Sequence, residues 1–282
     1  MFYGVINESY DKCDYLEMEL ENFNTFCKSL SIVQESGIQI LQESAWETFK
    51  EKVKELWDKF KNWVKDIIAK IKSIFTKDSV KKAEEANKSV QNAKGSNGFE
   101  PFEIEYQDAT GEKFDPKCVN AIDDKVLSII HGDKDFNKSI DELRKFEKEG
   151  FDNFMDFCFQ DLYKRKKITI KSVDEAKRFS DKITNLVKDI DNSITDYNKA
   201  VSLCQSSIFQ FEKELNTVLR ERKFNGKEIE SDTDFSDFSG VMNCIINIKK
   251  TALMNLRIKL SSCKSDSEEN NSAIKKIEKH IK

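Results

Sequence analysis

The sequence predicts an all-α protein: an elongated helical bundle built around a long antiparallel coiled-coil hairpin, with one short extended or β-hairpin insert. Three observations predict this fold class. Prolines and glycines are scarce, with two and nine in 282 residues, so long stretches contain no helix breaker. Apolar residues recur every three or four positions over most of the chain, which is the period of an amphipathic helix. Turn-forming residues gather in one window, 95–116, which therefore predicts the single non-helical insert.

Residues 1–94 are expected to form a helical segment in which an acidic helix precedes a basic, aromatic one. Residues 1–43 carry two lysines against eight acids, whereas 44–94 carry thirteen lysines against eight acids. Charge complementarity between neighbouring helices is the simpler interpretation of this contrast. The alternative is an acidic segment that masks a cationic helix until it is released.

Residues 95–117 are expected to form an extended linker or a small hairpin. Phe102, Ile104 and Tyr106 alternate with acidic residues, a pattern typical of a half-buried strand. Asp108–Gly111 is typical of a turn. We therefore predict a short local β-hairpin or an extended crossover near 99–114.

Residues 118–282 are expected to form a second helical domain. It should begin with two short helices, one ending near Gly132 and one over 140–158. Ser172-Val173-Asp174-Glu175 is a capping box, and the apolar period then continues for roughly 45–50 residues. Two long helices, 173–222 and 235–282, joined by a short connection around Gly226, predict the antiparallel coiled-coil hairpin.

The composition argues against several classes of protein. The net charge of −4 gives no overall basic field for nucleic acid, and we expect Lys164-Arg165-Lys166-Lys167 to be a solvated helix end. No apolar stretch reaches the roughly 18 residues of a membrane span, and no signal peptide opens the chain. Seven cysteines without a CxxC pair favour reduced thiols in the cytoplasm.

No catalytic motif is present, so we expect no enzyme, no catalytic residue, no cofactor and no metal site. His131 and His280 are the only histidines, and no cysteine pair has zinc-ligand spacing. Phosphate-binding glycine loops are absent. Four cysteines lie on apolar stripes, where core packing is the expected role: Cys13, Cys27, Cys204 and Cys263.

The most informative segment is the amphipathic stretch Ser44–Lys77, with nine lysines against five acids. Aromatic anchors opposite a lysine-rich face are typical of a helix lying on an anionic membrane. They are equally typical of a bundle helix with its aromatics in the core, which is the simpler reading. The apolar face is our candidate interaction face: Trp46, Phe49, Val53, Trp57, Phe60, Trp63, Ile67 and Ile71.

Residues 41–75 resemble internal virion proteins of large tailed bacteriophages. The resemblance is carried by Leu41-Gln42-Glu43-Ser44 followed by WETFKEKVKELWDKFKNWVKDIIAKIKSIF. Leu41-Gln42-Glu43 is similar to the apolar-x-Glu sites cut by prohead proteases, and Ile140-Asp141-Glu142 matches as well. The resemblance implies processing between Glu43 and Ser44.

For function, the resemblance implies a non-enzymatic structural protein packed inside the capsid or bound to capsid or portal proteins. It would reside in the virion, and in the host cytoplasm during assembly. Two other classes stay open: a cytoplasmic coiled-coil scaffold or adaptor, and a membrane-active, pore-forming-like protein using 44–77. The expected partners are other virion proteins or a second copy of the chain, and an anionic membrane in the last case.

Overall fold

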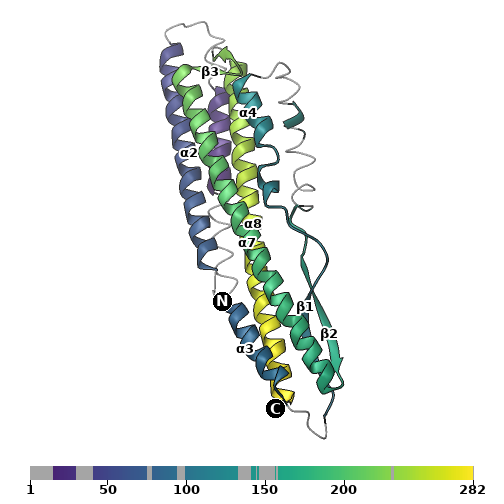
Figure 1. Cartoon of the computed structure of the whole chain (residues 1–282). Coiled ribbons are helices and arrows are strands. Elements are labelled where there is room, and N and C mark those ends of the chain that lie inside the picture. The colour runs from purple at the N-terminus through teal and green to yellow at the C-terminus, as the bar shows by residue number, and fades with distance from the viewer. Residues whose placement is uncertain are drawn as a thin grey trace. The chain divides into compact units, whose positions relative to one another are not determined.

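A computed structural model describes residues 15–29, 41–74, 78–93, 99–132, 141–143, 145, 156, 158–229 and 232–281. These residues are mostly helical, with a small antiparallel two-strand sheet and a two-residue strand pair (Figure 1). The predicted all-α character is therefore confirmed. Contacts divide the chain into two compact units.

The first unit combines Met1–Ile68, Val119–Phe154 and Leu203–Leu253. It contains a helix over 15–29, most of α2 (Leu41–Ser73), α4 (Asp123–His131) and the adjoining parts of the two longest helices. These two are α7 (Val173–Glu221) and α8 (Asp232–Ile281). Most of the predicted helix over 140–158 lies outside the described residues.

A tight hairpin joins α7 to α8 within this unit. Strands β3 (Lys223–Phe224) and β4 (Lys227–Glu228) pair across Asn225 and Gly226. Both turn residues have positive φ, 56° and 67°, as a two-residue hairpin turn of type I′ requires. Gly132 ends α4 against the same turn, and a Cβ on it would lie 2.9 Å from the Asn225 carbonyl carbon. Glycine at 132 therefore permits this close approach.

The second unit combines Ala69–Cys118, Met155–Ser202 and Met254–Lys282. It contains α3 (Ser79–Gln91), β1 (Phe102–Ala109) and β2 (Tyr163–Ile170), together with the start of α7 and the end of α8. These elements share one apolar core, to which α3 contributes Ala83, Ala86 and Val90. A 3-10 turn, Pro116–Asn120, follows the strand β1 along the chain.

The strand predicted near 99–114 is present, and of the two alternatives the extended segment is correct and the short hairpin was wrong. Strand β1 pairs with β2, in a register that runs from Phe102↔Ile170 to Ala109↔Tyr163. The prediction that 164–167 is a solvated helix end was also wrong, because these residues lie in β2. Four consecutive charged residues hide the period of two that marks a strand.

The capping box at the start of α7 is present in modified form. The backbone N–H of Glu175 donates to Ser172 Oγ at 3.2 Å, as predicted. The Glu175 carboxylate accepts from the backbone N–H of Lys171 at 2.8 Å, one residue before the expected donor. Two N-terminal N–H groups are still satisfied, which is what a capping box achieves.

Ile190→Ala is expected to lower the free energy of unfolding by about 2–5 kcal/mol, because it leaves a cavity at a fully buried position of α7. Its predicted neighbour on the seam, Ile194, is only half buried. Urea denaturation followed by circular dichroism at 222 nm measures the change. The matched variant Asp189→Ala, at the preceding exposed position, should change stability by less than about 0.5 kcal/mol. Equal losses at the two positions would show that the core assignment is wrong.

Candidate functional site

The apolar face of α2 is the candidate interaction surface, and the structure places all of it in the protein interior. No member of the set is more than 6% exposed: Trp46, Phe49, Val53, Trp57, Phe60, Trp63, Ile67 and Ile71. A molecule outside the chain could therefore reach this face only if the parts of the protein that bury it moved away.

Phe49 shows what provides that cover in the first unit. Its ring centroid lies 4.7 Å from that of Phe235 and 5.4 Å from that of Phe238, both on α8. Phe23, on the helix over 15–29, lies 6.1 Å away. Both contacts to α8 are edge-on, the geometry that aromatic rings prefer. The start of α2 is therefore held between two other helices by ring contacts.

The lysine-rich side of α2 forms ion pairs with its neighbours. Lys59 Nζ lies 2.8 Å from Glu19 Oε2 and 2.9 Å from Glu55 Oε1. Hydrogen bonding to Lys59 lowers the pKa of Glu19, and bonds to Lys59 and Lys52 lower the pKa of Glu55 to about 2. Lys61 pairs with Glu212 on α7. The Glu19–Lys59 contact is the kind of charge complementarity that the sequence favoured for neighbouring helices.

Two tryptophans on this face have no hydrogen-bond partner for their indole N–H in the part of the chain that the structure describes. The indole N–H groups of Trp57 and Trp63 are buried and unpaired, whereas that of Trp46 is not among the buried unpaired atoms of the described residues. An unsatisfied buried donor costs about 1–3 kcal/mol. The packed position of α2 is therefore less favourable than its apolar burial alone suggests.

The predicted processing site lies at the beginning of α2. Leu41, Gln42 and Glu43 are in the first helical turn, and their side chains lie outside the described part of the chain. Ser44 is exposed, and its carbonyl accepts a hydrogen bond from Thr48 Oγ1 at 2.8 Å. Cleavage after Glu43 would therefore require this turn to unwind. In the second matching tripeptide, Ile140 lies outside the described residues, and Glu142 pairs with Lys125.

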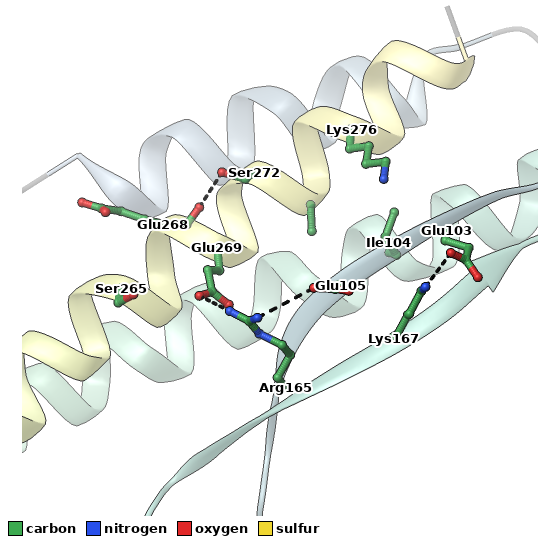
Figure 2. A pocket seen from close by; sticks show the side chains of 11 residues that line it. Glu103, Ile104, Glu105, Arg165, Lys167, Ser265, Glu268, Glu269, Ser272 and Lys276 are labelled. Atoms are coloured by element: carbon green, nitrogen blue, oxygen red, sulfur yellow. Dashed lines mark hydrogen bonds and ion pairs between the residues drawn. The ribbon is translucent and has the colours of Figure 1, made fainter.

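The second unit contains a charged groove of about 490 Å³ that was not predicted from the sequence (Figure 2). Strand β1 supplies Glu103 and Glu105, β2 supplies Arg165 and Lys167, and α8 supplies Glu269. Figure 2 shows these side chains turned toward one another, with Lys276 extending from α8 toward the strands. Acids at alternate positions of β1 match bases at alternate positions of β2, and that complementary spacing could have identified the pairing.

The charges in this groove largely neutralise one another. Arg165 lies 2.6 Å from Glu269 and 3.9 Å from Glu105, and Lys167 lies 2.7 Å from Glu103. The acidic partners raise the pKa of Arg165 and of Lys167. Asn270 adds a buried clamp, because its amide both accepts from the Gln107 N–H, at 2.7 Å, and donates to the Gln107 carbonyl, at 3.1 Å. This chemistry fastens the sheet to α8.

A smaller cavity of about 20 Å³ adjoins Asp266 on α8, about the space that one water occupies. Burial, and then the nearby Glu269 charge, raise the pKa of Asp266 from 3.8 to about 6. Asp161 also raises it, whereas Lys259 and a hydrogen bond from Ser262 act in the opposite direction. The folded protein thus holds this proton more tightly than the unfolded chain does.

Asp266→Asn is expected to stabilise the protein at pH 7.5 and to have little effect at pH 4. The stability associated with the protonated carboxyl is present below pH 3.8 and is lost as the pH rises toward about 6. Thermal melts between pH 4 and pH 8 should show a decline for the wild type that the variant lacks. Ser262→Ala controls for loss of the hydrogen bond alone. A wild-type pH profile that the variant reproduces would contradict the assignment.

The remaining candidate groups do not converge on one site in the described residues. No group of three or more His, Cys, Asp or Glu side chains that could hold a metal occurs among them. Cys27, Cys204 and Cys263 are buried, as predicted, and burial raises their pKa to about 12. Cys13 lies outside the described residues. No described helix combines the length and apolarity needed to cross a bilayer.

Comparison with known proteins found no match. No family model fits the chain, and no curated protein or solved structure matches it.

Proposed function

We propose that this chain is a non-enzymatic structural protein that binds other proteins through α7 and α8, which pair antiparallel as a coiled-coil hairpin. The two helices have 49 and 50 residues. In the second unit, Ala176 near the start of α7 shares a core with Ile277 and Ile281 at the end of α8. In the first unit, the β3–β4 turn joins the other two ends. The shared core in the second unit and the short turn in the first both support an antiparallel hairpin.

The observation that carries this proposal is a pair of large apolar side chains exposed on these helices. Phe209 on α7 is 72% exposed, and Ile258 on α8 is 54% exposed. Neither side chain contributes much to the core. Aromatic side chains, phenylalanine among them, are enriched at protein interfaces relative to the rest of the surface, so Phe209 is the preferred anchor for a partner.

Cross-linking mass spectrometry on the native particle or cell extract tests the proposal. Cross-links from the lysines of α7 and α8 to other proteins should be lost in Phe209→Ser, while the melting temperature stays unchanged. Gln210→Ser, at the adjacent exposed position, is the matched control and should keep the cross-links. A cross-link pattern unaffected by Phe209→Ser would overturn the role of Phe209 as the anchor.

We also propose that the protein is a component of a bacteriophage virion. There it would be packed inside the capsid or bound to capsid or portal proteins. The support is the resemblance at 41–75, including the tripeptide Leu41-Gln42-Glu43. Mass spectrometry of the protein from purified particles should find a new N-terminus at Ser44. Glu43→Gln should prevent that processing, whereas Glu142→Gln, in the second matching tripeptide, should not. Absence of the protein from particles would exclude the virion role and leave a cellular scaffold.

A further inference from the structure

We propose that α2 is also a releasable anchor for anionic lipid, in which its aromatic face exchanges its protein cover for the headgroup region of a membrane surface. This role goes beyond the structural one and does not depend on it. Three independent features of α2 support it: two unsatisfied indoles, a lysine-rich outer face and a cover held in part by exchangeable ion pairs.

The first feature is the state of the two indoles. Trp57 and Trp63 are 4% and 5% exposed, and their N–H groups have no hydrogen-bond partner among the described residues. The buried Lys249, in contrast, donates to three oxygens. Tryptophan is enriched at membrane interfaces because its ring is buried in the apolar layer while its N–H meets water or headgroups. Transfer to lipid would therefore provide both indoles with the hydrogen bonds that they lack in the protein.

The second feature is the charge of the outer face. From Lys59 to Lys77 the segment has six lysines and one acid, Asp66. Lys65 and Lys72 are exposed on α2. Each lysine near an anionic headgroup strengthens membrane partitioning by about fivefold at moderate ionic strength. A cationic face beside an apolar one selects an anionic lipid surface over a neutral one.

The third feature is how the cover is attached. The helix over 15–29 contacts α2 through the Phe23 ring, which lies 6.1 Å from that of Phe49, and through the Glu19–Lys59 ion pair. The side chains of that pair are still 19% and 27% exposed, so solvent and ions reach it. A phosphate headgroup offers Lys59 the same charge that Glu19 does, and can replace it when α2 moves to lipid.

Vesicle flotation of the full-length chain tests the inference. The probes are vesicles of phosphatidylglycerol and phosphatidylcholine in equal parts, and vesicles of phosphatidylcholine alone. We expect binding to the anionic vesicles, at least tenfold weaker binding to the neutral ones, and a decline as salt rises from 50 to 500 mM. Equal binding to both, or none to either, would overturn the proposal.

Conservative tryptophan variants test the role of the indoles. Trp57→Phe with Trp63→Phe removes the two unsatisfied donors and should weaken binding to anionic vesicles by about tenfold or more. Trp46→Phe, on the same face but without an unsatisfied buried donor, should change binding by less than about threefold. The double variant should also lose less thermal stability per substitution than Trp46→Phe, because it removes two unpaired polar groups. Equal effects on binding would show that the unpaired N–H groups play no part.

Lysine variants separate the charge effect from folding. Lys65→Gln with Lys72→Gln should lower the partition coefficient by more than tenfold without lowering the melting temperature. Lys81→Gln with Lys275→Gln, at exposed positions of α3 and α8, is the matched control and should reduce it much less. Equal reductions would indicate non-specific attraction and overturn the role of α2. Phe209→Ser should leave vesicle binding unchanged, so the lipid role and the protein-binding role can fail separately.

Discussion

Asp123→Ala is expected to lower the free energy of unfolding by about 3–5 kcal/mol. Its partner Lys249 is only 1% exposed. Lys249 Nζ donates to Asp123 Oδ1 at 2.6 Å, to the Val119 carbonyl at 2.8 Å and to Asn120 Oδ1 at 3.1 Å. Loss of the carboxylate leaves a buried ammonium with neutral acceptors alone. Urea denaturation of both proteins measures the difference.

Two further variants make this test specific. Asp124→Ala, at the neighbouring exposed position, should cost less than about 0.5 kcal/mol. Asp123→Leu combined with Lys249→Met removes both charges and should recover much of the loss, because a buried ion pair can often be replaced by apolar residues. A loss in Asp123→Ala no greater than that in Asp124→Ala would mean that the pair contributes little to folding.

Phe49→Ala is expected to cost about 3–5 kcal/mol, as aromatic truncations in a core usually do. Phe49 is fully buried, and its ring lies among those of Phe23, Trp46, Phe235 and Phe238. The cavity left by the ring would be lined by aromatic carbons on three helices. Calorimetric or urea unfolding gives the value.

Phe209→Ala provides a control with the same side chain deleted from an exposed position. Phe209 is 72% exposed, so its removal should change stability by less than about 0.5 kcal/mol. Similar losses at positions 49 and 209 would contradict the assignment of the α2 face to the core. The two variants together measure how much of the effect comes from burial.

The long helices could be predicted from sequence because their information is local. The apolar period of α7 continues without a breaker, and Ser172 and Glu175 mark its start within four residues. The apolar face of α2 could be predicted from the sequence in the same way. Whether protein or lipid covers such a face depends on other helices, so periodicity alone left both interpretations open.

The features that were missed depend on residues far apart in the chain. The β2 strand carries consecutive charges whose partners lie on β1 and α8, so its own sequence resembles a solvated helix end. Lys249 interrupts an apolar pattern, and its partner Asp123 is 126 positions away. A lysine within an apolar helical pattern is predicted to lie at the surface unless its buried hydrogen-bond acceptors are known. The pattern within any one of these segments does not reveal its partner, and only a comparison of the acids of β1 with the bases of β2 shows their matching spacing.

The distance between β1 and β2 along the chain has a consequence during synthesis on the ribosome. The contact that closes the strand pair joins Thr110 to Leu162, 52 positions later. At about 5–20 residues per second, β1 waits about 3–10 s for its partner to be made. The Asn270 clamp on Gln107 comes later still, 163 positions after it. A nascent chain therefore carries β1 unpaired for seconds, with Phe102, Ile104 and Tyr106 uncovered, and chaperones that bind nascent chains should raise the yield of folded protein.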